Sequence, residues 1–242
     1  MKHTKSSKVI GLLALAVILL AATGCVSRVR VGDLQSESQS VELGDADAVS
    51  VNIDFPAGEL ELSGGAEKLL EADFTYNVDK LKPEVEYSNG KLVVSAPDAE
   101  GLSVLPGITE FQNEWGLRLN EQVPMDLKVN VGAGVTNLLL AGLALSGLDV
   151  TVGAGETTID LSGDWASDLE ATIDAGAGEV RLRLPKDVGV RVVVDAGVGD
   201  IDAPGMTQDG DVYTNAAYGA SDVTLDVNVQ AGIGKIILEL VG

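Results

Sequence analysis

Three stretches of the chain repeat one pattern: LKVNVGAGVTNLLL at residues 127–140, LDVTVGAGETTIDL at 148–161 and ATIDAGAGEVRLRL at 171–184. In each stretch, apolar residues alternate with mostly polar ones on both sides of a Gly-Ala-Gly corner. A period of two places one face of a strand in the interior. The pattern therefore predicts pairs of half-buried strands joined at glycine corners.

Related corners recur along the chain at a nearly constant interval. Gly132, Gly153, Gly176 and Gly197 are 21, 23 and 21 residues apart. Such a period is typical of repeat folds, in which each unit buries its apolar face against its neighbours. Glycine permits positive φ and lets adjacent corners stack without Cβ collisions. The six corners are Phe55-Pro56-Ala57-Gly58, Gly132-Ala133-Gly134, Gly153-Ala154-Gly155, Gly176-Ala177-Gly178, Gly197-Val198-Gly199 and Gly232-Ile233-Gly234.

We predict an all-β protein, a single-stranded β-solenoid of stacked 21–23-residue coils that occupies residues 47–242. The same alternation would also fit an antiparallel β-sandwich, which stays as the alternative fold. Two insertions interrupt the repeat, at about 66–122 and 203–222. The first contains Asn89-Gly90 between two alternating runs, which predicts a β-hairpin.

The N-terminus is predicted to be a lipoprotein signal peptide over residues 1–24. Lysines precede an apolar run that is short for a membrane span, and small residues follow it. Ala22-Thr23-Gly24-Cys25 resembles a bacterial lipobox, so Cys25 is the expected lipidation site. The polar residues 25–46 are expected to form a flexible tether. These features predict a bacterial envelope protein, lipid-anchored on the extracytoplasmic side and in the outer membrane where the host has two.

The charge of the chain restricts its partners. The formal net charge is −21, and loss of Lys2, Lys5 and Lys8 with the signal would leave 13 basic against 37 acidic residues, or −24. Long-range repulsion makes nucleic acid a poor partner for such a surface. The only histidine, His3, lies in the signal, and Cys25 is the only cysteine. Histidine-based and thiol-based catalysis are therefore excluded for the predicted domain.

Several segments resemble the toast-rack domains of bacterial envelope proteins, which are related to the cell wall-active antibiotics response and adhesin families. The resemblance covers residues 47–242. The segments that carry it are Asn113-Glu114-Trp115, Val123-Pro124-Met125-Asp126-Leu127, the Gly-Ala-Gly corners, residues 183–190, Asp211-Val212-Tyr213-Thr214-Asn215 and Ala231-Gly232-Ile233-Gly234.

The resemblance implies a stacked β-solenoid without catalytic activity. Some similar proteins sense or tune envelope stress at the membrane, usually beside transmembrane helices or a signalling partner. This chain differs in its lipoprotein signal. We therefore expect a non-enzymatic binding or scaffolding lipoprotein, linked to envelope-stress sensing, that binds an envelope protein or a cell-wall component. An adhesin is the alternative.

Carboxylates are the residues with which this chain could bind a cation. If successive coils stack in sequence order, Asp174 and Asp195 lie on adjacent coils, and Glu179 follows the same corner as Asp174. Strands about 4.8 Å apart would bring such side chains close enough for an oxygen-only Ca²⁺ site. They would also allow paired acid and base catalysis in a carbohydrate-active β-helix enzyme. The simpler interpretation is a solvated acidic face, and no other cofactor is expected.

The second insertion is a candidate partner-binding loop, because insertions in repeat proteins project from one face. Its candidate contact residues are Tyr213, Asn215 and Tyr218. The last strand, residues 236–240, ends the chain without an obvious cap. An uncapped edge can pair with another chain, so an end-to-end homodimer is expected there.

Overall fold

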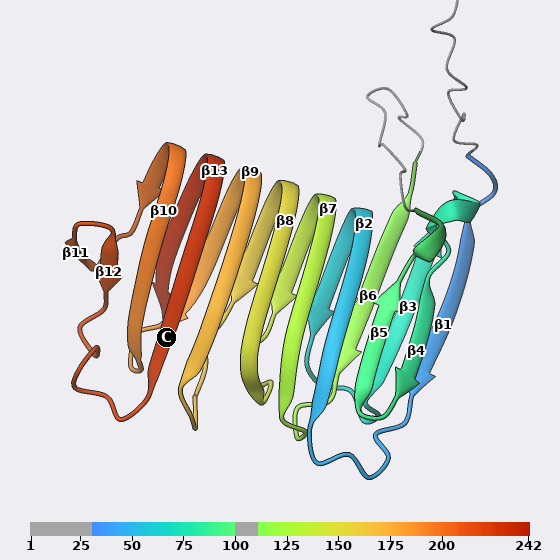
Figure 1. Ribbon diagram of the computed structural model, residues 1–242, viewed down its shortest axis with the longest axis horizontal. Coiled ribbons are helices and arrows are strands. Elements are labelled where there is room, and N and C mark those ends of the chain that lie inside the picture. The colour runs from blue at the N-terminus through green and yellow to red at the C-terminus, as the bar shows by residue number, and fades with distance from the viewer. Residues whose placement is uncertain (1–30, 100–110) are drawn as a thin grey trace, which may run out of the picture. The chain divides into compact units, whose positions relative to one another are not determined.

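The computed structural model describes residues 31–99 and 111–242, and every long element in them is a strand (Figure 1). The predicted signal peptide, Cys25 and residues 25–30 of the predicted tether lie outside the described residues. Six strands of 14 to 18 residues carry the repeat. They are β2 (Val49–Ser63), β7 (Met125–Leu139), β8 (Leu145–Asp160), β9 (Leu169–Pro185), β10 (Gly189–Asp202) and β13 (Thr224–Val241).

Each of the six strands forms one coil, which bends back at its glycine corner (Figure 1). We call the residues before the corner the first leg and those after it the second leg. Both legs pair in parallel and in register with the neighbouring coil. On the first legs Val129 is level with Val150 and Ile173, and the second legs continue the same register after the corner. The predicted all-β solenoid is confirmed, and the antiparallel sandwich is not formed by these coils.

The core lies between the two legs of the coils. The alternating apolar residues that point inward are at most 4 % exposed along β2, β7 and β8, and those of β9 are equally buried except for the half-buried Ala175. Residues between them face outward and are mostly polar. At about 25 cal/mol for each Å² of apolar surface, this burial is the main force that holds one coil on the next.

Both glycines of a corner are required by the spacing of the coils. Gly155 has a φ of +133°, and a methyl group on its Cα would overlap the carbonyl oxygen of Gly134 on the neighbouring coil. A methyl group on Gly153 would likewise meet the carbonyl oxygen of Gly132. The corners are therefore structural, since no other residue fits a backbone packed this closely.

The last coil is not at the end of the stack. β13 pairs with β9 on one side and with β10 on the other, so the order of coils is β2-β7-β8-β9-β13-β10. The expectation that residues 236–240 form an uncapped end is therefore wrong. Ile236 is level with Val180 on one side and Ile201 on the other. The 21 residues between β10 and β13 give the chain enough length to return past β10.

Additional strands extend the two sheets beyond β2 at the N-terminal end. The second-leg sheet continues through β6 (Asn113–Leu119), β3 (Leu70–Tyr76) and β1 (Gln35–Val41). The first-leg sheet continues through β5 (Lys91–Ser95) and β4 (Glu84–Ser88). The predicted hairpin turn is confirmed, with φ of +51° at Asn89 and +74° at Gly90. Two short 3-10 helices, η1 (Asp79–Leu81) and η2 (Pro97–Ala99), complete this end.

Aromatic residues fill the core at the N-terminal end. Trp115 on β6 is 1 % exposed and makes edge-to-face contacts with Phe55 and Phe74, with ring centroids 5.0 and 5.4 Å apart. Its Nε1 donates a hydrogen bond to Asn113 Oδ1, and Asn113 Nδ2 donates to the carbonyl oxygen of Ala57. This contact joins β6 to the corner of β2.

The strand β1 corrects the prediction of a tether over residues 25–46. Residues 35–41 pair with β3 along their full length, from Gln35 opposite Tyr76 to Val41 opposite Leu70. β1 lies at the edge of the sheet and carries polar side chains, so it lacks the apolar alternation by which strands are recognised. Ser38 Oγ donates to Asp73 Oδ1 on the neighbouring strand at 2.5 Å.

The C-terminal end is extended on its first legs only. β11 (Thr207–Asp209) and β12 (Val212–Thr214) form a hairpin, and β12 pairs with Arg191–Val193 of β10.

Within residues 31–99 and 111–242, no helix has the length and apolar character needed to cross a membrane.

Candidate binding surface on the first legs

Six polar side chains form a continuous line on the outer face of the first legs. Five of them precede the first glycine of their corner by two positions, and Asp54 precedes Pro56 by two; the parallel register places each beside the next. With about 4.8 Å between strands, the line is about 24 Å long. We call it the polar row, and in spatial order its members are Asp54, Asn130, Thr151, Asp174, Gln230 and Asp195.

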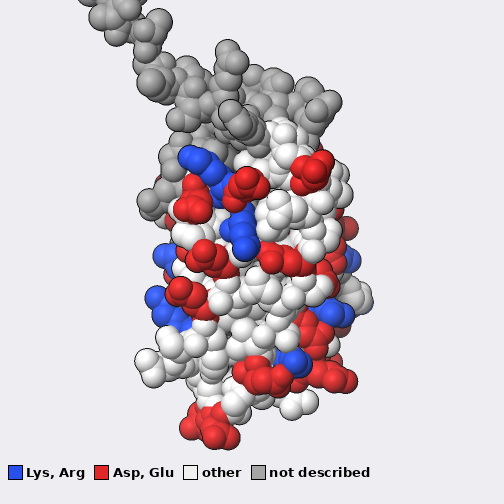
Figure 2. All heavy atoms as spheres, turned by 90° about the vertical axis from the view of Figure 1, so that its right-hand side faces the viewer, with Lys and Arg blue, Asp and Glu red and all other residues white. Residues whose placement is uncertain are grey.

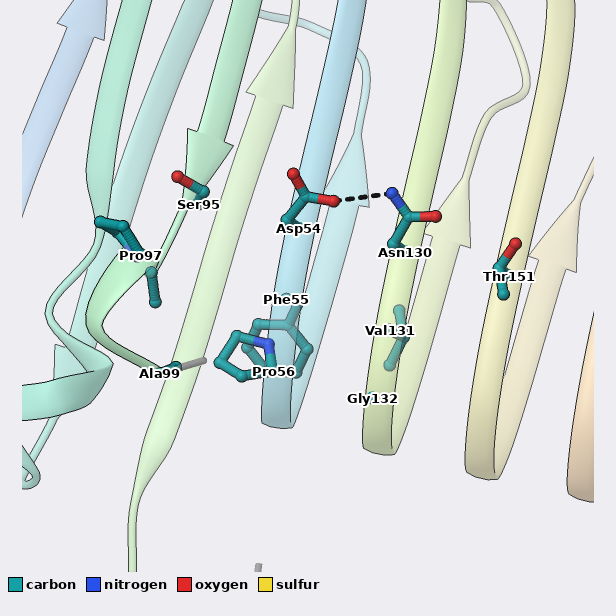
Figure 3. Close-up of a pocket in the computed structure, with 11 residues that line it drawn as sticks. Asp54, Phe55, Pro56, Ser95, Pro97, Ala99, Asn130, Val131, Gly132 and Thr151 are labelled. Carbon is teal, nitrogen blue, oxygen red and sulfur yellow. Dashed lines mark hydrogen bonds between the residues drawn. The ribbon is translucent and has the colours of Figure 1, made fainter. Parts of the chain in front are cut away.

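Hydrogen bonds fix the polar row at its N-terminal end. Asn130 Nδ2 donates to Asp54 Oδ1 at 2.7 Å (Figure 3). Asn52 Nδ2 donates to the other carboxylate oxygen at 2.8 Å. Two amide donors hold the Asp54 carboxylate in one orientation. A ligand would therefore meet an ordered acceptor at this position.

A hollow of about 760 Å³ lies beside this end of the row (Figure 3). Ser95, the last residue of β5, and Pro97 line one side of it, and Asp54, Asn130 and Thr151 line the other. Phe55, Pro56 and Val131 are among the apolar residues that also line it. A mainly apolar hollow with a few fixed polar groups is the usual form of a binding site for a small or extended ligand.

A second hollow of about 590 Å³ continues along the row from Thr151. Asp174, Gln230 and Asp195 line it together with the first glycines of their corners. Thr151 lines both hollows, so they are contiguous. The surface is thus long and narrow, and it repeats once per coil.

The predicted cation site does not form as expected. Gln230 on β13 lies between Asp174 and Asp195, so these carboxylates are two coils apart, about 10 Å, and not on adjacent coils. Glu179 is on the second leg and is bound to Arg181 Nη2 at 2.8 Å. No three His, Cys, Asp or Glu side chains among the described residues are grouped to hold a metal ion. The expectation failed because it assumed that coils stack in sequence order.

The same separation bears on the alternative of a carbohydrate-active enzyme. A pair of catalytic carboxylates must lie on both sides of one scissile bond. The carboxylates of the polar row instead point outward from β2, β9 and β10, with neutral side chains between them. The row has the form of a binding surface.

Two of the three candidate contact residues in the partner-binding loop are buried. Tyr213 is 6 % and Asn215 is 5 % exposed, so neither is available to a partner. Asn215 Oδ1 accepts from the Val190 N–H at 3.0 Å, and its Nδ2 donates to the carbonyl oxygens of Pro185 and Val188 at 3.1 and 2.7 Å. Of the three, Tyr218 alone is accessible, at 43 %.

Counting two residues back from each Gly-Xaa-Gly corner gives five members of the polar row and misses Asp54. The corner of β2 has Pro56 where the other five corners have their first glycine. Counting back from Gly-Xaa-Gly therefore skips this coil. Asp54 is recognised as a member of the row only from the parallel register of β2 and β7, which places it beside Asn130.

Two side chains at the N-terminal end, away from the row, have displaced pKa values. Burial, followed by the nearby Glu37 carboxylate, raises the pKa of Tyr76 above its usual value. The hydrogen bond and charge of Glu42 raise the pKa of Lys68, whose Nζ lies 2.6 Å from Glu42 Oε1. Both displacements stabilise the protonated side chain, and neither prepares a group for proton transfer at the polar row.

Comparison with known proteins agrees with this architecture. The family model for the N-terminal domain of toast_rack, DUF2154, matches residues 30–183. The chain therefore belongs to the toast-rack family.

A crystal structure of a "putative cell adhesion protein" from Clostridium sporogenes is similar over 86 % of this chain and 100 % of that chain, with 32 % identity and a TM-score of 0.82. A "putative adhesin" from Bacteroides fragilis aligns over 85 % of this chain and 97 % of that chain, with 11 % identity and a TM-score of only 0.31. No curated protein matches the sequence.

Proposed function

We propose that this protein is a non-enzymatic, lipid-anchored component of the bacterial cell envelope that binds or scaffolds another envelope component along the polar row. The observation that carries this proposal is the in-register line of carboxylate, amide and hydroxyl groups beside two contiguous hollows. A repeating surface suits an extended ligand that presents hydrogen-bond donors at regular intervals. Cell-wall polymers and extended protein segments both have this property.

Lipid anchoring at Cys25 is supported by the sequence and by the path of the first described residues. The Gly32 N–H donates to the carbonyl oxygen of Asn77 at 2.7 Å, so the chain is attached to the domain there. Gly32 lies seven positions after Cys25, so the two residues are at most about 25 Å apart. An acylated Cys25 would therefore keep the domain close to the membrane surface.

Replacing Cys25 with Ser tests the anchor. The variant should move from the membrane fraction to the soluble fraction, because acylation requires the thiol. A variant that stays in the membrane fraction would contradict lipidation at this residue.

Binding along the polar row is tested with purified cell-wall fragments and with solubilised membranes. A variant with Asp54→Ala, Asn130→Ala and Asp174→Ala should lose at least about tenfold in affinity, since each change removes a hydrogen-bonding group from the contact. Glu59→Ala, Asn137→Ala and Glu179→Ala form the matched control on the outer face of the second legs. Equal binding by both variants would exclude the row.

An adhesin is the second candidate, and the likeness to the Clostridium sporogenes protein favours it. An adhesin should mediate attachment of whole cells to a surface or to other cells. A scaffold should capture components of its own envelope and leave attachment unchanged. Comparing both measurements in a deletion strain separates the two roles.

We extend the proposal to envelope-stress sensing, in which occupancy of the polar row would be passed to a signalling partner. The family resemblance of the sequence supports this role. A reporter of envelope stress should then respond differently in cells that carry the three-residue row variant and in cells that carry its control.

A further inference from the structure

One of the four sheet ends of the stack lacks an added strand. At the N-terminal end, β5 extends the first legs and β6 extends the second legs. At the C-terminal end, β12 pairs with Arg191–Val193 of the first leg of β10. In the described part of the chain, the end of the first leg of β10, its corner and its short second leg pair with β13 alone, over Ala196–Asp202. We call residues 196–202 the open edge.

Apolar side chains are exposed at the open edge. Ile201 occupies an inward position and is level with Ile236 and Val180 on the next two coils. Those two residues are 2 % and 4 % exposed, whereas Ile201 is 36 % exposed because no strand covers it. At the adjacent corners, Val198 is 69 % and Ile233 is 64 % exposed.

The residues of the open edge carry only negative charge. Asp200 and Asp202 are exposed and alternate with Ile201, and residues 196–202 contain no Lys or Arg. One cation lies beside them, because Lys235 on β13 is level with Asp200. The opposite end of the stack carries both signs of charge (Figure 2). Its ion pairs include Arg118 Nη2 with Glu71 Oε2 at 2.8 Å.

Charge argues against a second copy of this chain as the occupant. Two open edges would bring Asp200 and Asp202 of both copies together. β1, the free edge at the other end of the second-leg sheet, carries Glu37 and no Lys or Arg. Like charges across a contact oppose pairing, and the high net negative charge adds to the repulsion.

We propose that the open edge receives an extended segment of a partner protein in which basic and aliphatic side chains alternate. The segment would add a strand to the second-leg sheet through main-chain hydrogen bonds. Its aliphatic side chains would cover Ile201, and its basic side chains would lie beside Asp200 and Asp202. This interaction is separate from the polar row, which lies on the first legs.

The probe is a fluorescently labelled peptide of seven residues that alternates lysine with valine. Two comparison peptides isolate charge and strand pairing: glutamate replaces lysine in one, and proline replaces valine in the other. Binding to the full chain in detergent is measured by fluorescence anisotropy. Amide hydrogen exchange then locates the contact.

The lysine–valine peptide should bind and protect amides in residues 196–202, while the other two peptides should bind at least about tenfold more weakly. The Asp200→Lys/Asp202→Lys variant should also bind at least about tenfold more weakly. Asp45→Lys/Asp47→Lys, in the loop before β2, makes the same change in charge and should bind like the unmodified chain.

Three results would overturn the proposal. The first is no measurable binding of the lysine–valine peptide. The second is equal binding of the proline peptide without amide protection, which would show attraction between charges only. The third is concentration-dependent protection of residues 196–202 in the absence of peptide, which would identify a second copy as the occupant.

Discussion

In the interior of the stack, β7, β8 and β9 repeat one contact, in which each corner glycine packs against a carbonyl of the preceding coil. At the ends, single side chains connect the added elements to the stack: Trp115 joins the N-terminal strands to β2, and Asn215 attaches the C-terminal loop to residues 185–190. A repeated contact distributes stability over several coils, whereas an end depends on one residue. We therefore expect substitutions in the interior to affect the whole stack, and those at an end to affect that end first.

The largest effect should come from Gly155→Ala in the interior. The new methyl group would overlap the carbonyl oxygen of Gly134 at a backbone φ of +133°, so the coils must separate. We expect a loss above about 4 kcal/mol in the free energy of unfolding, or no folding at all. Urea denaturation measures it. Gly65→Ala is the control, because Gly65 also has positive φ but has no atoms near the added methyl group, and should cost only about 1 kcal/mol.

Trp115→Ala should be the most damaging change at the N-terminal end. It removes two aromatic contacts and the hydrogen bond to Asn113, at a cost of about 3–5 kcal/mol. Hydrogen exchange should show early loss of protection in β3 and β6. Trp165→Ala, which removes a half-buried side chain, is the matched control with a smaller loss. Uniform loss of protection along the stack would contradict the distinction between ends and interior.

Asn215→Ala should destabilise the C-terminal end by about 3 kcal/mol, since it leaves buried backbone groups of residues 185–190 without partners. Protection should fall first in β12 and β10 and persist in β7 and β8. Asn228→Ala changes an exposed asparagine on β13 and should have little effect. Similar losses for the two variants would rule out the structural role of Asn215.

Thr157→Val should stabilise the interior by about 1 kcal/mol. The Thr157 hydroxyl is buried and has no hydrogen-bond partner among the described residues, so a methyl group of similar size removes a desolvation cost. Thr157→Ser keeps the hydroxyl and loses the methyl group, and it should destabilise instead. Thermal unfolding of the two variants shows whether each substitution raises or lowers the stability of the protein.

The smallest expected effect is a pH dependence at the N-terminal end. Because the pKa of Tyr76 is raised in the folded protein, the unfolded state loses this proton first as the pH rises. The free energy of unfolding should therefore fall from about pH 10, the ordinary tyrosine value, up to the folded pKa. Tyr76→Phe should remove this part of the slope and keep the contribution of the other tyrosines. Identical slopes for Tyr76→Phe and for the unmodified chain would show that Tyr76 does not cause this pH dependence.

Local patterns in the sequence predicted the coils well. Alternation around five Gly-Xaa-Gly corners and around Pro56-Ala57-Gly58 located the six coils, and Asn89-Gly90 located a hairpin turn. Each of these features is determined by residues close together in the chain, through side-chain period and backbone conformation. The strand β1 was missed because an edge strand with polar side chains on both faces has no such period.

The order of the coils was not predictable from the same patterns. β9, β10 and β13 present nearly the same alternation of side chains, so each fits beside either of the others. The position of β13 depends on the long connection after β10 and on contacts across the whole stack. The error about Asp174 and Asp195 followed from this ambiguity.

The insertion of β13 between β9 and β10 also determines when the domain can complete its folding. Until residues 224–241 have left the ribosome and reached the compartment where the chain folds, β9 and β10 each lack the neighbour that lies between them. The coils up to β9 can assemble in order as they emerge, but the last two must assemble together. Contacts between such distant segments form slowly. Completion of the C-terminal end is therefore the expected slow step in folding, and a chain that lost its last strand would stop at that point.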